Sequence, residues 1–403
     1  MPTAAERITG LLLGLAMLTG CGAGAGASHA RLPAAQATPS APAGHTPGRR
    51  KAHGRSGIPT ADLPYVYGLH MATPTTGWIE AGALFRTTNG AASWHQVFQR
   101  PGAVLAWAAP TAQRAWVVMQ TGAASHLQVW ATADAGTEWH AQSLAAPWPV
   151  TSVHLQVTAG GMGSLIALGP LGSGMQSRGQ RLWHIMGGAL VTSPAYTTRN
   201  GQLLDASWVS SADGWATAAS AAGNDTASVL RQTTDGGREW TPVALPLPAG
   251  IPSPAGSSHF LPSLALGPAP VFVETQDGYL AAALSTAAPP ATYPVLYHTT
   301  SGAGWTVQWL GPIHHTFTQL RWVTPQVVWA VLAPGFGPSA TQIGVSADGG
   351  RSWTLESAPV PSARVYDLVP VSSSEAVLFA LLPSQQLAVY ATANGGRTWQ
   401  ARG

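Results

Sequence analysis

The sequence has few charged residues and almost no cysteine. Asp, Glu, Lys and Arg make up only 9% of the 403 residues, and Cys21 is the only cysteine, so it has no disulfide partner within the chain. Gly and Pro are frequent, at 46 and 33 residues, and 45% of the residues are hydrophobic. This composition excludes long solvated helices and favours short strands joined by many turns. The sequence therefore predicts an all-β fold.

Basic residues are scarce beyond the N-terminal segment. Before residue 59 the chain holds Arg7, Arg31, Arg49, Arg50, Lys51 and Arg55. The remainder carries 13 Arg, no Lys and 15 acidic residues, so it is close to neutral despite a pI of about 9.2. A nucleic-acid-binding domain needs basic residues on its folded surface, often beside aromatic ones. We therefore expect no nucleic-acid partner.

The N-terminus has the pattern of an export signal. Its apolar run from Leu11 to Leu18 is too short to span a bilayer and has the length of a signal-peptide core. The residues Leu18-Thr19-Gly20-Cys21 resemble a bacterial lipobox, in which the cysteine thiol receives a diacylglyceryl group. This resemblance implies a lipoprotein signal peptide over residues 1–20 and lipid attachment at Cys21. The alternative is an ordinary signal peptide with an incidental cysteine.

Lipid attachment at Cys21 would make the mature protein extracytoplasmic and anchored to the cell membrane, since more than one acyl chain gives stable anchoring. Residues 21–58 are rich in Gly, Ala, Pro, Ser and His and have no apolar periodicity. They are predicted to form a disordered linker between the lipid and the folded domain, which covers residues 59–403.

A short segment ending in tryptophan recurs about every 45 residues. It has the form Thr-x-Asp-Gly-Gly-x-x-Trp in its fullest copies, such as residues 233–240 and, with Ser in place of Thr, 346–353. Asp or Asn can accept backbone N–H bonds inside a turn, Gly permits positive φ, and Trp packs at the start of the returning strand. The candidate turn residues are Asn89, Trp94, Asp134, Trp139, Asp235, Trp240, Trp305, Asp348, Trp353, Asn394 and Trp399.

The spacing of these segments predicts the number of repeats. The interval from Trp139 to Trp240 is about twice the repeat length, and Trp183-His184 lies near the expected place for a repeat that lacks the segment. We therefore predict a single β-propeller of about seven four-stranded blades. Tryptophans that recur before the segments, among them Trp78, Trp215 and Trp329, are expected in its core.

These segments resemble the Asp-box, or BNR, motif, and residues 60–403 resemble the superfamily of sialidase-like and sortilin-like propellers. The Gly-Trp and Thr-x-Asp-Gly-Gly-x-x-Trp pattern is most similar to the photosystem II assembly and stability factor-like proteins. The resemblance implies that the Asp-box residues are structural and lie on an outer turn away from the central channel.

Candidate catalytic and metal-binding residues are few. A sialidase needs an arginine triad and a nucleophilic tyrosine with a glutamate partner, but the sequence has no Arg-Ile-Pro segment near the first blade and places Arg238, Arg351 and Arg397 in the repeated turns. The cross-blade spacing of carboxylates such as Glu80, Asp205 and Asp367 is not readable from the sequence. Adjacent residues such as His314 and His315 face opposite sides of a strand, so they do not predict a metal site. We therefore expect no catalytic residues, no metal and no cofactor.

The anchor, the fold and the missing catalytic set favour a non-catalytic binding or assembly scaffold that presents one propeller face to an unknown protein or glycan. We expect the protein to be monomeric. The alternative function is a glycan-active hydrolase of the sialidase or xyloglucanase type. Trp148, which lies between two prolines at a blade junction, is the candidate partner-binding residue. The Pro-rich stretches 245–262 and 287–294 are further candidates, since surplus loops on rigid scaffolds tend to carry function.

Overall fold

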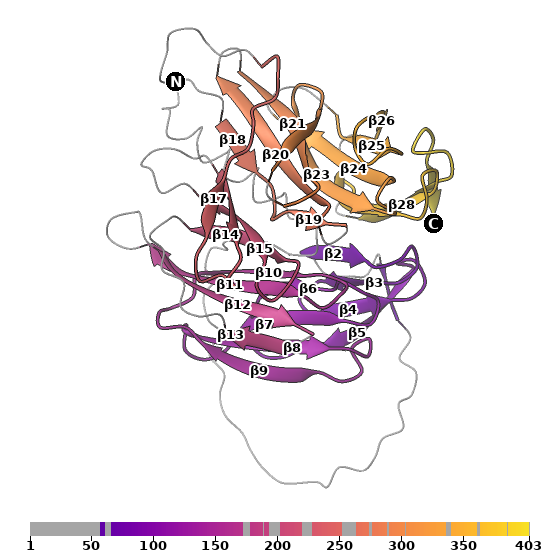
Figure 1. The fold of residues 1–403 in the computed structure, drawn as a ribbon. Helices are drawn as coiled ribbons and strands as arrows, with labels where there is room; N and C mark the ends of the chain where they lie inside the picture. The colour runs from indigo at the N-terminus through magenta and orange to yellow at the C-terminus, as the bar shows by residue number, and fades with distance from the viewer. Residues whose placement is uncertain are drawn as a thin grey trace, which may run out of the picture.

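The computed structural model describes residues 57–60, 66–171, 178–187, 189–192, 202–219, 228–251, 263–273, 276–287, 290–302, 304–335, 340–360, 363–384 and 386–402. All regular elements among them are β-strands, which form seven antiparallel sheets (Figure 1). Among these described residues there is no helix of the length and apolarity required to traverse a bilayer.

Each sheet is one blade and consists of strands that follow one another in the chain. Blade one comprises β2 (Gly68–Met71), β3 (Gly77–Glu80), β4 (Leu84–Thr87) and β5 (Ser93–Phe98), with β1 (Ile58–Pro59) added beside β5. Blade two comprises β6 (Ala103–Ala108), β7 (Ala115–Gln120), β8 (His126–Thr132) and β9 (His140–Ala145). Blade three comprises β10 (Ser152–Val157), β11 (Gly163–Leu171), β12 (Arg178–Met186) and β13 (Ala189–Thr192).

The remaining blades follow the same order from the centre outward. Blade four comprises β14 (Leu203–Trp208), β15 (Gly214–Ala219), β16 (Ser228–Thr233) and β17 (Thr241–Val243). Blade five comprises β18 (Ser263–Leu266), β19 (Val271–Phe272), β20 (Gly278–Ala287), β21 (Pro290–Thr299) and β22 (Thr306–Leu310). Blade six comprises β23 (His315–Trp322), β24 (Val328–Pro334), β25 (Gln342–Ser346) and β26 (Thr354–Ser357). Blade seven comprises β27 (Arg364–Pro370), β28 (Ala376–Leu381), β29 (Leu387–Thr392) and β30 (Gln400–Arg402).

The predicted seven-bladed propeller is thereby confirmed, including the third blade that lacks the repeated segment. Trp183 and His184, which indicated that blade, lie on β12, where Trp183 is buried. Since β10 to β13 form a complete four-stranded sheet, the long interval between Trp139 and Trp240 contains paired strands and not a loop.

The core consists of apolar clusters that each join two neighbouring blades. Tryptophans on the second strands contribute both apolar area and a hydrogen bond to the next blade. The fully buried Trp78 donates its indole N–H to the carbonyl of Thr111 at 3.1 Å, and Trp329 donates to Ser372 at 2.8 Å. A buried indole with a satisfied N–H fixes the distance between the two sheets as well as filling it.

The ring closes between the last blade and the first without exchanging a strand. In Figure 1 the indigo β2 and β3 lie near the yellow β28, and β2 contacts β27. The backbone N–H of Met71 donates to Oδ2 of Asp367 at 2.6 Å, and the Tyr366 hydroxyl donates to the carbonyl of Val66 at 2.9 Å. Side chains of β27 therefore hold the first blade in place.

The two ends of the ring differ. One end, which we name the box face, holds the connections between strands one and two and between strands three and four of each blade. These connections are bonded to each other, as where Gly236 N–H donates to Ala212 (2.9 Å) and Gly349 N–H donates to Gln326 (2.8 Å). The opposite end, named the pocket face, holds the connections between strands two and three and those that lead from one blade to the next.

Candidate functional site

The structure places the repeated turns on the box face, between the third and fourth strands. In blade four the Thr233 hydroxyl donates to Oδ1 of Asp235 at 2.8 Å, and that carboxylate accepts the backbone N–H groups of Arg238 and Glu239. These hydrogen bonds lower the pKa of Asp235, although its desolvation opposes them. The carboxylate thus stabilises its own turn.

Equivalent hydrogen bonds occur at Asn89, Asp134, Asp348 and Asn394. In blade five, which lacks the carboxylate, the Thr299 hydroxyl still accepts the N–H groups of Ser301 and Gly302. Two of the turns contain a non-glycine residue at positive φ, Ala91 at 70° and Ala135 at 65°. Positive φ is unfavourable for alanine, so the hydrogen bonds of the turn must hold these two residues in place.

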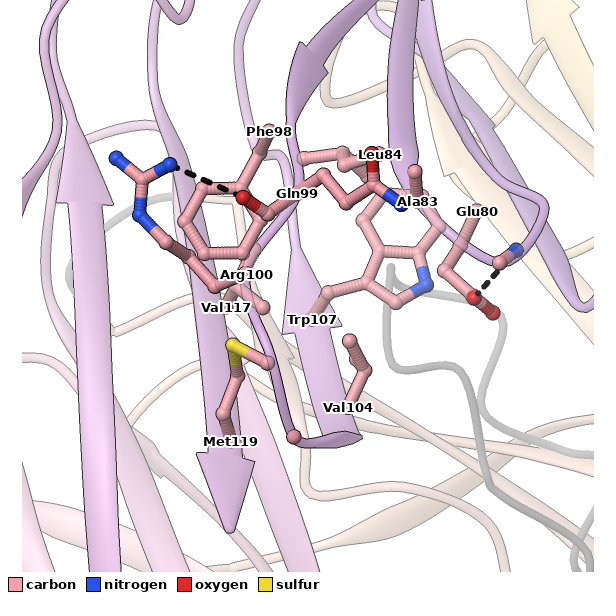
Figure 2. Close-up of a pocket in the computed structure, with 12 residues that line it drawn as sticks. Glu80, Ala83, Leu84, Phe98, Gln99, Arg100, Val104, Trp107, Val117 and Met119 are labelled. Carbon is pink, nitrogen blue, oxygen red and sulfur yellow. Dashed lines mark hydrogen bonds between the residues drawn. The ribbon is translucent and has the colours of Figure 1, made fainter. Parts of the chain in front are cut away.

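The pocket face contains a pocket at the seam between blades one and two. It opens between the connection 81–83 and the connection 99–102, and its volume is about 30 Å³, which is room for a few water molecules. The wall is mostly apolar, with Leu84, Phe98 and Met119 all buried. Figure 2 shows Glu80 and Arg100 on opposite sides of the pocket, with Trp107 and Leu84 between them.

Arg100 is an exposed cation held by aromatic rings. Its guanidinium carbon lies 5.1 Å from the ring centre of Trp130 and 5.7 Å from that of Phe98, and Nη1 donates to the carbonyl of Gln99 at 3.0 Å. Stacking on aromatic faces orients a guanidinium while leaving its remaining N–H groups free to reach outward. Arg100 can therefore meet a carboxylate, a carbonyl or a hydroxyl group at the pocket mouth.

Glu80 gives the other side of the pocket a hydrogen-bond acceptor. Its Oε1 accepts the N–H of Gly82 at 3.2 Å, and partial burial raises its pKa against the effect of that hydrogen bond. Between the two charged groups, the indole N–H of Trp107 is buried and has no acceptor among the described residues. The pocket thus offers the donors of Arg100, the acceptor of Glu80 and apolar contacts within one small depression.

A second polar cluster lies at the inner strands of blades six, seven and one. Nη2 of Arg321 donates to Oδ1 of Asp367 at 2.7 Å and lies 3.1 Å from Nδ1 of His70, while that nitrogen is 3.6 Å from Oδ2 of Asp367. Burial, and then the charge of Arg321, lower the pKa of His70 to about 4 against the opposing effect of Asp367. Neutral His70 therefore accepts the guanidinium N–H through Nδ1 and carries its proton on Nε2.

Asp205 occupies a comparable position in blade four. Its Oδ2 accepts the N–H of Ala269 in blade five at 3.0 Å, and its Oδ1 accepts the N–H of Ala206. From blade three, the Gln156 amide reaches the same group: in the orientation that satisfies both of its ends, its nitrogen donates to Oδ1 of Asp205 (3.2 Å) and to the carbonyl of Ala206 (2.8 Å). Burial raises the pKa of Asp205 to about 6, although the two backbone N–H bonds lower it.

Asp205 and Asp367 thus bond to backbone of the next blade, as Gln319 does through Tyr366 and Leu368. The two carboxylates belong to separate clusters, each with its own partners. Among the described residues no group of three or more His, Cys, Asp or Glu side chains is placed to hold a metal ion. The two ring nitrogens of His315 instead lie 3.1 Å from the carbonyls of Ile313 and Ala340, and a neutral ring can donate to one of these.

Trp148, the candidate partner-binding residue, lies on the pocket face in the connection that leads from blade two to blade three. Its ring is partly buried and lies over Gly169 and Gly179, where an added Cβ would be within 2.3 Å and 2.5 Å of it. It also packs against the core cluster between these blades. Its predicted contact with a partner stays a prediction, but its replacement would also disturb packing.

The stretch 287–294, predicted as surplus loop, differs in the structure. Residues 290–294 belong to β21, which pairs with β20 from Pro290 opposite Ala287 onward. The prolines are compatible with this because β22 pairs only with Val295–His298, so the neighbouring edge of β21 is free at Pro290. Cys21 and residues 252–262 of the other Pro-rich stretch lie outside the described residues.

The fold and this site define a seven-bladed β-propeller with a small polar-rimmed pocket between two blades. No protein-family model matches the chain, and no curated protein matches it either. Similar solved structures include a GH74 xyloglucanase from Xanthomonas campestris, with 15% identity, a TM-score of 0.47 and coverage of 83% of this chain and 52% of that one. This chain therefore spans about half the length of the xyloglucanase.

Two further similar structures are matched over nearly their whole length. YCF48 bound to D1 peptide has 15% identity and a TM-score of 0.46, with coverage of 84% of this chain and 98% of that one. The β-propeller domain of the Trilobed protease from Pyrococcus furiosus has 8% identity and a TM-score of 0.49, with coverage of 84% and 98%. Propellers with such different names share this architecture, so the likeness assigns no function.

Proposed function

We propose that this protein is an exported, lipid-anchored and non-catalytic binding or assembly scaffold, which presents its pocket face to a protein or glycan partner. The observation that carries the proposal is the pocket between blades one and two, where Arg100 and Glu80 border an apolar wall. Such a mixture of a few placed polar groups and apolar surface is typical of recognition sites.

The contrast between the two faces supports this choice of surface. On the box face the turn carboxylates accept backbone N–H groups of their own turns, and neighbouring connections are bonded to each other. On the pocket face, Arg100 is exposed, and its guanidinium is held against the Trp130 ring and by the carbonyl of Gln99. A partner therefore finds an oriented cation beside the pocket.

The hydrogen bonds that the inner carboxylates already make favour a binding function over hydrolysis. Glycoside hydrolysis needs two carboxyl groups about 5 to 10 Å apart, one of them free to exchange a proton with the substrate. Asp205 and Asp367 each accept backbone N–H bonds from a neighbouring blade, which assigns them to holding the ring together. A wild-type chain that hydrolyses chromogenic glycosides would contradict the proposed function.

Replacing Arg100 with alanine should weaken the binding of the partner. Wild type, Arg100→Ala and the control Arg351→Ala would each be purified from native membranes with whatever they hold. Because arginines at interfaces often contribute about 2 kcal/mol or more, we expect on the order of 30-fold less partner with Arg100→Ala. The control removes an exposed arginine of the box face. Equal recovery from all three proteins would place the partner elsewhere.

Replacing Cys21 with serine should release the protein from the membrane, since serine has no thiol to receive the lipid. Metabolic labelling with an alkyne fatty acid should mark the wild type and leave Cys21→Ser unmarked, and cell fractionation should find the variant in the soluble fraction. The propeller begins well beyond residue 21, so the folded domain should keep its melting temperature. Label that persists on Cys21→Ser would refute the anchor.

A further inference from the structure

The outer strand of each blade has an edge on which another strand could pair, and unprotected edges of this kind promote association. In blade one the chain itself covers that edge. Strand β1 pairs antiparallel with β5, with Ile58 opposite Trp94, and the Trp94 indole donates to the Thr60 hydroxyl at 3.0 Å. The outer edge of a blade in this protein therefore accepts an additional strand.

Among the described outer strands, β9 has the least protected edge. With six residues it equals β5, whose edge β1 covers, and it is longer than every other described outer strand; five of its residues are exposed. It pairs with β8 over its whole length without a bulge, and its sequence His-Ala-Gln-Ser-Leu-Ala contains no proline and no Asp, Glu, Lys or Arg. These are the features that natural edge strands normally avoid.

The other uncovered outer strands are shorter than β9, and most of them carry a further kind of protection. Strand β13 (Ala189–Thr192) has only four residues, whereas β17 contains Pro242, β26 contains Glu356 and β30 contains Arg402. In blade five the ladder between β21 and β22 is interrupted by a register shift, and Gln308 of β22 donates to the carbonyl of Gly349 in blade six. Prolines, charges and bulges each disfavour pairing with another strand.

The direction of the free backbone groups on β9 follows from one hydrogen bond. The N–H of Ala146 donates to the carbonyl of Ser125 at 2.9 Å, and in antiparallel pairs the bonded residues alternate along the strand. The N–H and C=O groups of residues 140, 142 and 144 therefore face β8. Those of Ala141, Ser143 and Ala145 face outward.

From this pattern we infer that β9 pairs antiparallel with β9 of a second copy of the chain, which makes a two-fold dimer through the rim of blade two. An outward residue must face an outward residue, and one register pairs all three outward residues of each strand, so we take that register for the dimer. Ser143 then lies opposite Ser143 of the second copy, and Ala141 lies opposite Ala145. A two-fold axis places residues near the centre against their own equivalents, so a charged central residue would repel itself.

A second copy suits this edge because both strands are then uncharged, and the outward N–H and C=O groups of one strand face those of the other. The interface is small, since it consists of one strand pair, so the dimer should be weak in dilute solution. The inference contrasts with the monomer expected from the sequence and does not depend on the identity of any partner of the pocket face.

The lone cysteine allows a direct test in the full chain. In a Cys21→Ser background, Ser143→Cys should form a disulfide-linked dimer under mild oxidation, because a bonded antiparallel pair has Cα atoms about 5.5 Å apart. The matched control is Ser357→Cys, which places a cysteine at an exposed position of β26. We expect on the order of tenfold more crosslinked dimer from Ser143→Cys, since pairing raises the local thiol concentration.

A second variant tests the pairing without a disulfide. Ser143→Lys places two ammonium groups against each other on the axis, and sedimentation equilibrium should find it monomeric at concentrations where the Cys21→Ser chain forms dimers. The exposed serine is not needed for folding, so both proteins should melt at the same temperature. A Cys21→Ser chain that stays monomeric, equal crosslinking of both cysteine variants, or a dimer that survives Ser143→Lys would each overturn the proposal.

Discussion

Replacing Asp367 with alanine should reduce the free energy of unfolding by about 3–5 kcal/mol, as expected when one partner of a buried ion pair is removed. The side chain of Asp367 is only 1% exposed and holds three groups: the Arg321 guanidinium, the Met71 N–H and its own strand's Leu368 N–H. Alanine leaves the guanidinium without this carboxylate and removes the hydrogen bond to Met71, which is one of two described between blade seven and blade one. The closure of the ring should therefore weaken first.

Urea unfolding at pH 7 gives the size of the effect, and hydrogen exchange gives its location. The control is Asp213→Ala, since Asp213 accepts a hydrogen bond from the Ser210 hydroxyl within one turn and joins no blades. Asp367→Asn should be intermediate, because an amide oxygen can still accept the Met71 N–H. If amide protection in β2 and β27 is unchanged in Asp367→Ala, the ring closes by other contacts.

The sequence predicted the fold well because the blades repeat. A tryptophan that ends a turn segment in several blades has a fixed place relative to the strands, so spacing alone gave the number of blades. Even blade three, which lacks the segment, retained Trp183 at nearly the expected interval. The turn chemistry depends on residues that are close in the sequence, and the repeat spacing can be counted along it. Both could therefore be recognised without the structure.

The sites that join blades were not predictable in the same way. Asp205 and Asp367 each lie within an inner strand among apolar residues, in Leu-Leu-Asp-Ala and Val-Tyr-Asp-Leu. A carboxylate within an apolar strand was the one sign in the sequence that these residues are buried and bonded. Their partners Ala269 and Met71 are 64 and 296 residues away. Packing of blade five on blade four brings Ala269 to Asp205, and closure of the ring brings Met71 to Asp367. The pocket likewise combines Glu80, at the end of β3, with Arg100 of the connection 99–102, and their proximity depends on blade packing.

Prolines led to the wrong expectation for residues 287–294, because proline usually marks a loop. The structure pairs residues 290–294 with β20 where no further strand lies beside them at Pro290. A missing N–H is harmless on such an edge, so the residue type was compatible with both structures. A proline is accepted in a strand only where no strand pairs with its missing N–H. Whether such a strand is present depends on how the sheet is assembled, which the local sequence does not show.

The two inner clusters should oppose each other in the pH dependence of stability. His70 has a pKa lowered from 6.5 to about 4, so between these values the unfolded chain binds more protons and stability falls as the pH falls. Asp205 has a pKa raised from 3.8 to about 6, so the folded chain binds more protons and stability falls as the pH rises through that range. Between about pH 4 and pH 6 the two effects nearly cancel.

Removing either group should reveal the other. His70→Asn keeps an acceptor for Arg321, and its stability should fall as the pH rises from 4 to 6. Asp205→Asn keeps an acceptor for the Ala269 N–H, and its stability should fall as the pH drops from 6.5 to 4. Each shift of two or more pKa units corresponds to about 3 kcal/mol. Urea unfolding at several pH values measures the free energy of unfolding of each variant. Because every other titrating group is common to the two variants, the difference between their pH curves isolates these two residues. Parallel curves would mean that neither group titrates as its surroundings require, whereas curves of opposite slope would show that burial at the inner strands sets the proton affinity of both.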